Sequence, residues 1–272
     1  MSGILYVVGT PIGNLGDLSP RALTVLEECD FIAAEDTRVT LKLLNHFSIK
    51  KQLVSYHEHN RFSQGEPIAE RILLGENCAL VTDAGMPAVS DPGEDLVRLC
   101  HEKGIKVESV PGPTAFATAV AISGMPSGRF TFEGFLSVNK VSRKEHLESL
   151  VNEKRTMVFY EAPHKLSRTL EDMAEYFGDR KIALVKELTK IHETVERTTL
   201  FAARDKYKEI PPKGEYVIVI DGAGEQTKEY TLDEAVKIAK ELLDGGTSVS
   251  EAAKKAAKET GLKKGDIYKE LI

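Results

Sequence analysis

Residues 78–93 read C-A-L-V-T-D-A-G-M-P-A-V-S-D-P-G, and residues 106–115 read K-V-E-S-V-P-G-P-T-A. Each stretch begins with a short apolar run typical of a strand and continues into a loop rich in Gly and Pro, which leads into a helical pattern. In an open parallel sheet, ligands bind outside the carboxyl ends of the strands. Because the two loops lie about one βα unit apart, the sequence predicts that they form two walls of one small-molecule site. Proline fixes φ and offers no donor, so four prolines stiffen these loops: Pro87, Pro92, Pro111 and Pro113.

The composition indicates a globular protein without an overall basic character. The chain has 272 residues, 42% of them hydrophobic and 7% aromatic, and a formal net charge of −6. A contact with nucleic acid therefore needs a local basic patch. Cys29, Cys78 and Cys100 are odd in number and lie in apolar or helical runs, which favours buried, reduced thiols and a cytosolic protein. The N-terminal M-S-G-I-L-Y-V-V-G is too short and uncharged for a signal peptide, and no apolar run approaches the roughly 20 residues of a membrane helix.

Strand and helix patterns alternate along most of the chain, which predicts an α/β fold with a mainly parallel first sheet. The first half has strand patterns at 4–8, 31–34, 53–56, 79–82 and 106–110. The second half has strand patterns at 130–135, 156–160, 182–185, 193–199 and 216–220, with helices at 143–152 and 166–177. Its β-branched, polar 195–199 stretch favours some antiparallel pairing. The breaks at 124–128 and 222–224 divide the chain into domains 1–123, 124–224 and 225–272.

The last of these domains is predicted to be a small helical tail. Thr231–Glu234 and Ser248–Glu251 have the spacing of capping boxes, and glycines at 245, 246 and 261 separate three short helices. Lysines give the tail a basic edge that could touch phosphates, although a solvated amphipathic surface explains the same charges. These lysines are Lys254, Lys255, Lys258, Lys263, Lys264 and Lys269.

Polar loops follow the other predicted strands of the first domain. G-T-P-I-G-N-L-G-D at 9–17 lacks both the G-x-G-x-x-G spacing and the lysine of a P-loop, so it is consistent with a ligand loop or a plain βα turn. In A-E-D-T-R at 34–38, charged groups can build a cleft, and Asp36 or Thr37 can equally cap the next helix. S-Y-H-E-H-N at 55–60 has two histidines but no nearby Cys or third His, so the sequence predicts no metal site and favours polar substrate contacts or a solvated loop.

The second domain adds Y-E-A-P-H at 160–164 and K-E-L-T-K at 186–190 after two of its strands. Because polar loops of both domains gather in this way, we expect a cleft between them. An exposed charged rim is the alternative interpretation of the same residues.

Taken together, these motifs resemble the tetrapyrrole-methylase-like superfamily and, within it, the bacterial ribosomal RNA small subunit methyltransferase I family. The resemblance rests on VGTPIGNLGD, AAEDTR, SYHEHN, LVTDAGMPAVSDPG, VPGPTA, FYEAPH and KELTKIHE, and it extends over residues 4–220. It implies two α/β/α domains of the tetrapyrrole methylase fold (class III methyltransferases) with a small C-terminal helical region. It also implies a homodimer that uses S-adenosylmethionine (SAM) to methylate the ribose 2′-oxygen of a cytidine in the decoding region of 16S rRNA.

Carried over motif by motif, the resemblance also implies a set of cofactor contacts in the cleft. The first domain contributes Thr10, Pro11, Ile12, Asp83, Ala84, Gly85, Met86, Thr114 and Ala115. The second domain contributes Tyr160, Glu161, Ala162 and Leu188.

The reaction asks for a group that accepts the proton of a weakly acidic ribose hydroxyl, and a carboxylate or histidine within hydrogen-bond reach can do so. The candidates for this catalytic role are Asp36, His57 and Glu58. Polar and basic residues of the same loops are candidates for substrate contacts. These are Asn14, Arg38, His59, Asn60, Arg61 and Lys186.

Three other interpretations stay open at this point. A nicotinamide oxidoreductase would bind NAD, and the glycine spacing argues against it. A methylase of a tetrapyrrole or another small molecule is the second, and the lysine-rich tail and the S-Y-H-E-H-N loop favour RNA over a flat macrocycle. The third is a non-catalytic RNA-binding assembly module, which would bind subunits without transferring a methyl group.

Overall fold

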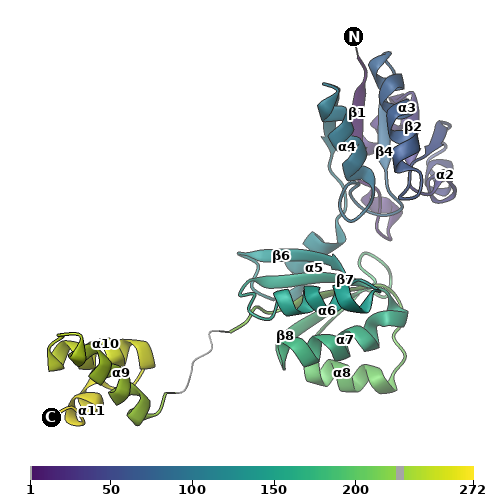
Figure 1. Cartoon of the computed structure of the whole chain (residues 1–272). Helices are drawn as coiled ribbons and strands as arrows, with labels where there is room; N and C mark the ends of the chain where they lie inside the picture. The colour runs from purple at the N-terminus through teal and green to yellow at the C-terminus, as the bar shows by residue number, and fades with distance from the viewer. Residues whose placement is uncertain (1, 225–229) are drawn as a thin grey trace. The chain divides into compact units, whose positions relative to one another are not determined.

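The computed structural model describes residues 2–224 and 230–272, and these form two compact units, Met1–Ala223 and Gly224–Ile272 (Figure 1). Residues 225–229, where the predicted tail domain begins, lie outside the described residues. The first unit contains two five-stranded sheets, and the second is helical. The predicted division of the first unit after residue 123 stays a prediction.

The first sheet is parallel throughout and has the strand order β3-β2-β4-β1-β5. Its strands match the predicted ones within two residues at each end. They are β1 (Ile4–Val8), β2 (Phe31–Ala34), β3 (Gln52–Ser55), β4 (Cys78–Val81) and β5 (Lys106–Val110). The connecting elements are η1 (Leu15–Asp17), α1 (Pro20–Glu28), α2 (Thr37–His46), α3 (Arg61–Leu73) and α4 (Gly93–Glu102). Sequential βαβ units therefore bring all the carboxyl ends of the strands to one edge.

Helices cover both faces of the first sheet because successive side chains of a strand point to opposite faces. Phe31 and Ala33 of β2 pack in one buried cluster with residues of α3 and α4, such as Ile68 and Leu96. Ile32 lies in the opposite cluster with residues of α1 and α2. Cys29, Cys78 and Cys100 are buried and free, as predicted. Ser19 caps α1 and Asp36 caps α2, both through side-chain oxygens.

The second sheet is mixed and has the order β6-β7-β10-β8-β9. Only β6 and β7 pair in parallel, so the predicted antiparallel pairing is confirmed. Its strands are β6 (Phe130–Phe135), β7 (Thr156–Glu161), β8 (Lys181–Lys186), β9 (Thr194–Thr199) and β10 (Tyr216–Ile220). Its helices are α6 (Lys140–Ser149), α7 (Pro163–Phe177) and α8 (Leu200–Glu209). Helix α8 has no counterpart in the predicted elements, and α6 begins and ends three residues earlier than predicted.

Helix α5 (Ala115–Ser123) follows the last strand of the first sheet but packs against the second sheet. It is apolar on all sides, and such a helix needs cover on several faces. Ala119 and Val120 lie in one buried cluster with Val158, Val185 and Val217. Helix α5 therefore fixes the loop that precedes it, at the end of β5, to the second sheet.

The second unit consists of α9 (Leu232–Asp244), α10 (Val249–Thr260) and α11 (Lys264–Lys269) around a small apolar cluster. The capping box at Thr231–Glu234 is confirmed. The one predicted at Ser248–Glu251 is wrong, because Ser248 precedes α10 without a side-chain capping bond. Its carbonyl instead accepts the amides of Glu251 and Ala252.

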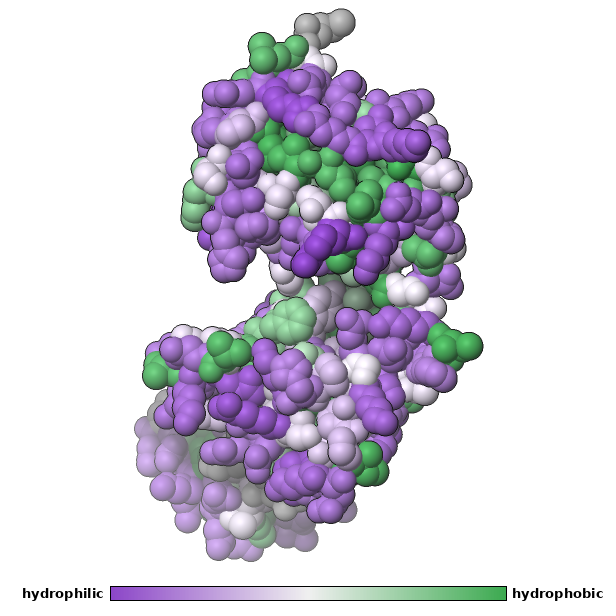
Figure 2. Space-filling model, turned by 90° about the vertical axis from the view of Figure 1, so that its right-hand side faces the viewer, coloured by the Kyte–Doolittle hydropathy of each residue, from purple (hydrophilic) through white to green (hydrophobic). Residues whose placement is uncertain are grey.

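One face of the molecule is mainly polar (Figure 2). Figure 2 shows hydrophilic side chains over most of one face, with apolar side chains gathered in smaller patches between them. Among the described residues, no helix combines the length and the apolar character that a membrane span requires.

Candidate active site

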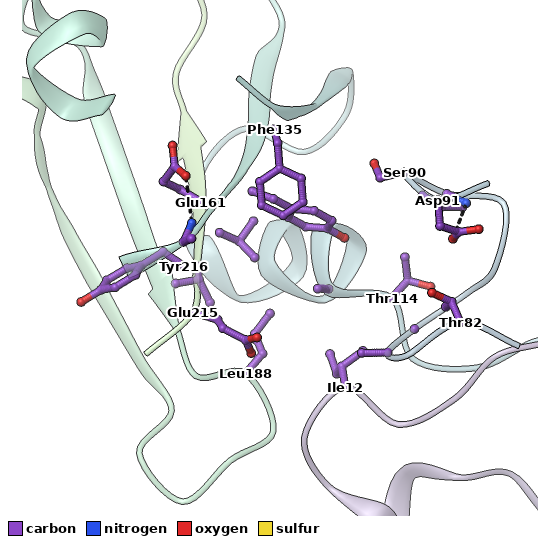
Figure 3. Close-up of a pocket in the computed structure, with 18 of the residues that line it drawn as sticks. Ile12, Thr82, Ser90, Asp91, Thr114, Phe135, Glu161, Leu188, Glu215 and Tyr216 are labelled. Atoms are coloured by element: carbon purple, nitrogen blue, oxygen red, sulfur yellow. Dashed lines mark hydrogen bonds between the residues drawn. The ribbon is translucent and has the colours of Figure 1, made fainter. Parts of the chain in front are cut away.

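A cavity of about 480 Å³ lies in the first unit, between the loops of the first sheet and one edge of the second sheet (Figure 3). The first wall is the side of the cavity formed by the first sheet and the loop into α5. It includes both of the Gly- and Pro-rich loops that the sequence predicted to form two separate walls, because the opposite side comes from the second sheet. Its lining residues are Ile12, Glu35, Thr82, Ala84, Gly85, Met86, Val89, Ser90, Asp91, Thr114 and Ala115. The second wall contributes Phe135, Tyr160, Glu161, Ala162, Pro163, His164, Val185, Leu188, Glu215, Tyr216 and Val217. Small-molecule sites commonly have volumes of about 300–1,000 Å³, so the cavity suits a nucleoside-sized ligand.

The loop after β4 is held by a single carboxylate. Asp91 accepts hydrogen bonds from the backbone amides of Ala88 (2.9 Å), Val89 (3.3 Å) and Gly93 (2.8 Å). Ala88 and Ser90 have φ values of 65° and 68°, a region that non-glycine residues rarely adopt. Such conformations persist where surrounding contacts determine them, and here the Asp91 carboxylate supplies these contacts. Burial raises the pKa of Asp91, and the hydrogen bonds from the three amides partly offset this increase.

The loops after β1, β4 and β5 approach one another at backbone distance. Thr10 and Gly85 exchange two backbone hydrogen bonds, of 2.9 and 3.1 Å. A Cβ atom on Gly9 would lie 2.6 Å from the Cα of Gly112 and 2.7 Å from the sulfur of Met86. Glycine at position 9 is therefore required for this close approach. The three loops of the first wall therefore meet through their backbones.

Glu35 and Thr82 occupy equivalent positions just beyond the paired strands β2 and β4, where Ala34 pairs with Val81. The Thr82 hydroxyl donates to Glu35 Oε2 at 2.5 Å, and the Asp83 amide donates to the same oxygen at 3.4 Å. In return, Asp83 Oδ1 accepts the amide of Asp36 at 3.0 Å. Burial, and then the charge of Glu35, raise the pKa of Asp83. The ends of the two strands thus form one acidic, hydrogen-bonded group.

The second wall presents aromatic rings and one buried carboxylate. The Tyr160 hydroxyl accepts the Phe116 amide at 3.0 Å, which satisfies a free donor in the first turn of α5. The Tyr160 ring makes edge contacts with Phe132 and Phe135, with ring centroids 4.9 and 5.4 Å apart. Burial raises the pKa of Tyr160, so the hydroxyl stays neutral. Phe135, 56% exposed, brings an apolar ring to the edge of the cavity.

Glu161 is only 4% exposed, and both of its oxygens are hydrogen-bonded. The Ala162 amide donates to Oε1 at 2.9 Å, and the Thr169 hydroxyl donates to Oε2 at 2.5 Å. Thr169 in turn accepts from Arg143, which pairs with Asp172. A buried carboxylate needs such partners, and this network fixes the end of β7.

The charge of the cavity limits what it can hold. Its described lining contains four carboxylates, Glu35, Asp91, Glu161 and Glu215, and neither lysine nor arginine. A low-dielectric cleft lined by one sign of charge attracts ligands of the opposite sign. The cavity therefore suits a ligand that carries a cation, and a phosphate group is disfavoured inside it.

Most of the residues predicted to contact a cofactor line this cavity. They are Ile12, Ala84, Gly85, Met86, Thr114, Ala115, Tyr160, Glu161, Ala162 and Leu188. Thr10, Pro11 and Asp83 are not among the described lining residues. Thr10 and Asp83 instead tie the loops of the first wall together. The binding roles of all thirteen stay predictions.

The three predicted catalytic residues, Asp36, His57 and Glu58, are not among the described residues that line the cavity. Asp36 caps α2 and pairs with Arg38, which holds the pKa of Asp36 well below its usual range. Glu58 pairs with Arg61 at 3.0 Å. His57 Nδ1 is buried without a hydrogen-bond partner in the described structure. Their catalytic roles stay predictions.

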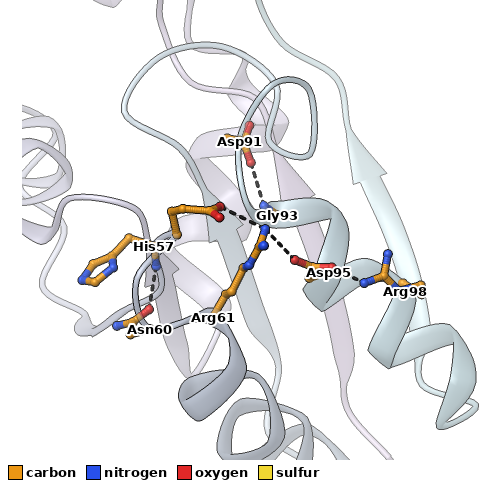
Figure 4. Close-up of polar contacts among 8 residues, drawn as sticks. His57, Asn60, Arg61, Asp91, Gly93, Asp95 and Arg98 are labelled. Carbon is orange, nitrogen blue, oxygen red and sulfur yellow. Dashed lines mark hydrogen bonds and ion pairs between the residues drawn. The ribbon is translucent and has the colours of Figure 1, made fainter. Parts of the chain in front are cut away.

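The predicted substrate residues lie on several loops, and Figure 4 shows the group at the start of α3. Asn60 Oδ1 accepts the His57 amide at 2.8 Å, and Asn60 Nδ2 donates to the Ser55 carbonyl. Arg61 pairs with Asp95 at 3.0 Å in addition to Glu58, so its charge is compensated within the protein. His59 is exposed, with its ring 6.0 Å from that of His57.

Three predicted substrate residues lie elsewhere in the sequence. Asn14 and Arg38 precede this loop, and Lys186 follows it. Asn14 caps η1 by accepting the Gly16 amide at 3.0 Å. The Arg38 side chain is 86% exposed although it pairs with Asp36. Lys186 ends β8. Contacts of these residues with a substrate stay predictions.

The sequence-based prediction missed Glu35, Thr82 and Phe135 as lining residues. The first two had a usable signal, since each directly follows a buried apolar strand. Phe135 had none, because an aromatic residue at the end of a strand is also typical of a core residue.

Comparison with known proteins agrees with this geometry. Residues 4–204 match the family model of tetrapyrrole (corrin/porphyrin) methylases. The solved structure of a uroporphyrin-III C-methyltransferase from Thermus thermophilus, complexed with S-adenyl homocysteine, superimposes with a TM-score of 0.57. The match covers 80% of this chain and 97% of that one, at 16% identity, and so reports on the fold. The chain is a methyltransferase with the tetrapyrrole methylase fold.

Two curated relatives narrow this class. A protein of Synechocystis sp. is 44% identical over 98% of this chain and 96% of its own, and a protein of Xylella fastidiosa is 46% identical over 98% of both. Both are named ribosomal RNA small subunit methyltransferase I. The chain belongs to the ribosomal RNA small subunit methyltransferase I family, and the resemblance read from its sequence is confirmed.

Proposed function

We propose that this methyltransferase transfers the methyl group of SAM to the ribose 2′-oxygen of a cytidine in the decoding region of 16S rRNA. It acts on the small ribosomal subunit, as a cytoplasmic homodimer. The observation that carries the proposal is the match over nearly the whole chain to relatives named for ribosomal RNA of the small subunit. The cavity between the two walls supports the choice of methyl donor.

The residues of the cavity fit SAM in size and in charge. About 480 Å³ accommodates a nucleoside, and the four lining carboxylates suit the sulfonium and amino groups of the donor. Apolar side chains from both walls, including Ile12, Met86 and Leu188, can enclose the adenosine. When bound, the sulfonium supplies an electrophilic methyl group. The protein contributes orientation, exclusion of water and a group that accepts the proton of the hydroxyl.

The charge distribution also supports separate binding places for the methyl donor, inside the cavity, and for the RNA backbone, outside it. Phosphates are disfavoured among the carboxylates of the cavity, so the RNA backbone has to stay outside while one sugar enters. The predicted phosphate contacts outside it are Arg38, Arg61, Lys186 and the lysines of the helical tail. Such contacts make affinity for RNA fall steeply with salt, by counterion release.

The test is methyl transfer from tritiated SAM to three acceptors, namely small ribosomal subunits, free 16S rRNA and a tetrapyrrole. The expected label is on one cytidine of the decoding region, at the ribose, and the subunit is the best acceptor. Label on the tetrapyrrole alone, or binding of subunits without any transfer, would contradict the proposal.

A further inference from the structure

We propose that Glu35 is the catalytic base of this enzyme: its carboxylate accepts the proton of the ribose 2′-hydroxyl as the methyl group is transferred. The inference rests on the proposed function, because it names a ribose hydroxyl as the acceptor. It assigns to Glu35 a role that the sequence had suggested for Asp36, His57 or Glu58.

The position of Glu35 is set by the sheet. It is the first residue after β2, next to β4, and its side chain lines the cavity. The Thr82 hydroxyl and the Asp83 amide both donate to Oε2, so the carboxyl group is held in one orientation. Thr82 is only 8% exposed, which makes this hydroxyl a fixed partner. Oε1 accepts no hydrogen bond from any described residue.

The other carboxylates of the cavity have their oxygens or their charge already engaged. Asp91 accepts three backbone amides through its two oxygens. Glu161 uses Oε1 for an amide and Oε2 for a hydroxyl. Glu215 pairs with Lys190 at 2.8 Å, and its side chain is 77% exposed. Among the described lining residues, Glu35 therefore combines an orienting donor, a free oxygen and no cationic partner.

The neighbouring Asp36 illustrates the contrast. Its carboxylate accepts the Arg38 amide at 2.8 Å and pairs with the Arg38 guanidinium, and this hydrogen bonding lowers the pKa of Asp36 strongly. A base with such a low pKa has little driving force to take a proton. Although the two residues are adjacent in sequence, only Glu35 lines the cavity.

The O–H bond of the ribose breaks and its proton goes to Glu35 Oε1. The ribose oxygen forms a bond to the methyl carbon, while the bond between that carbon and the sulfonium sulfur breaks and leaves its electron pair on sulfur. The products are a methyl ether, a neutral thioether and a protonated Glu35, which then returns its proton to water.

The experiment compares Glu35→Gln with Glu28→Gln. Glu28, at the end of α1, loses the same charge on the same domain, and it is exposed and makes no side-chain contact in the described structure. Single-turnover methylation of small subunits by Glu35→Gln is expected to fall by about 10²–10⁴-fold, the usual range for a general base. Glu28→Gln is expected to keep the parental rate.

The affinity for the donor and the pH dependence of the rate separate a base from a residue that binds the donor. Calorimetry should give an unchanged affinity of Glu35→Gln for the neutral S-adenosylhomocysteine and only a slight loss for SAM, because three other carboxylates still line the cavity. A loss of about tenfold or more for SAM alone would mean that Glu35 binds the sulfonium and would overturn the proposal. Glu35→Asp, which keeps a carboxylate, should lose less activity and keep the acidic limb of the pH–rate profile, whereas Glu35→Gln should lose that limb. The Asp variant also serves if the Gln variant does not fold.

Failure of this inference and failure of the proposed function give different results. If the parental protein methylates the subunit and Glu35→Gln does so at the same rate, Glu35 is not the base and the proposed function stands. The same conclusion follows if Asp36→Asn or Glu58→Gln, and not Glu35→Gln, abolishes turnover. If the parental protein transfers no methyl group to RNA, both the function and the inference are wrong.

Discussion

The two walls of the cavity are built by different kinds of sheet. In the first wall, every strand runs in the same direction, so loops and carboxylates meet at the carboxyl edge. In the second wall, β10 runs antiparallel to β7 and β8, so its beginning lies beside their ends. Each wall brings two carboxylates to the cavity, Glu35 and Asp91 from the first and Glu161 and Glu215 from the second, and the second wall adds the aromatic rings. Asp91 and Glu161 have both oxygens hydrogen-bonded and Glu215 pairs with a lysine, so the parallel edge presents the one available carboxylate among the described lining residues, and the mixed edge mainly provides shape.

The largest effect is expected where loops of the first wall touch. Gly9→Ala places a Cβ 2.6 Å from the Cα of Gly112, which is too short for a real contact, so the backbone of one of the two loops has to shift. We expect a loss of about 1–3 kcal/mol in the free energy of unfolding, as for overpacked cores, together with a loss of SAM binding. Denaturant unfolding and calorimetry measure the two. Gly128→Ala is the control, since no atom lies within 4 Å of its added Cβ. If both variants have the same stability and the same SAM affinity, the loops of the first wall accommodate the added Cβ without cost, which would contradict this prediction.

A smaller effect on the same wall is expected from Asp83→Ala. The change leaves the Asp36 amide without its 3.0 Å acceptor and frees the turn that carries Glu35. The loss of one hydrogen bond costs about 0.5–1.5 kcal/mol, and we expect SAM to bind about tenfold more weakly, which equals about 1.4 kcal/mol.

Asp30→Ala is the matched control for this prediction. Asp30 accepts the Asn77 amide at 2.6 Å and so bridges the beginnings of the same two strands. It should lower stability without changing the SAM affinity measured by calorimetry. Unchanged affinity in Asp83→Ala as well would mean that the ends of β2 and β4 do not shape the donor site.

The second wall predicts the reverse pattern, in which stability falls and binding stays. Tyr160→Phe keeps the ring against Phe132 and Phe135 but removes the acceptor of the Phe116 amide. We expect a loss of about 0.5–1.5 kcal/mol in the free energy of unfolding and nearly parental SAM affinity. Tyr176→Phe should change neither, because its hydroxyl makes no hydrogen bond in the described structure. A large loss of SAM affinity in Tyr160→Phe would contradict this prediction, because it would mean that the second wall also binds the donor through a polar group.

The smallest expected effect is a loss of stability at acidic pH, and it involves an ion pair outside both walls. Hydrogen bonds from the Arg155 side chain and backbone lower the pKa of Glu153 from 4.5 to about 2. The lowered pKa means that this pair stabilises the fold above pH 4.5 and that the contribution is lost as pH falls toward 2. Glu153→Gln should remove this part of the acid destabilisation, below about 1 kcal/mol for an ion pair at the protein surface.

Denaturant midpoints at several acidic pH values and at neutral pH measure this effect. Glu145→Gln, which changes an exposed carboxylate without an ion pair in the described structure, is the control and should follow the parental curve. If the denaturant midpoints of Glu153→Gln change with pH as those of the parental protein do, the pair with Arg155 contributes nothing to stability.

Much of the first wall could be predicted from the sequence, because its geometry follows from local rules. Apolar runs that end in Gly- and Pro-rich loops locate the strands, and the parallel order then places the loops at one edge. The role of Glu35 could not be predicted this way. Choosing between Glu35 and Asp36 requires knowing which of two adjacent side chains turns toward the cavity and which one pairs with Arg38.

The second wall was harder to predict because its geometry does not follow from local rules. Its contacts join residues far apart in sequence, such as Tyr160 and Phe116, and pattern analysis does not detect such contacts. The apolar helix α5 gives no amphipathic signal, so its packing against the second sheet could not be read from periodicity.

The most direct test of the whole account is a crystal structure of the protein with S-adenosylhomocysteine. We predict that the ligand occupies the cavity, touches backbone of the first wall near Gly85 and the rings of the second wall, and leaves Glu35 Oε1 open toward the substrate side. Ligand bound at another place, or contacting one wall alone, would contradict the account.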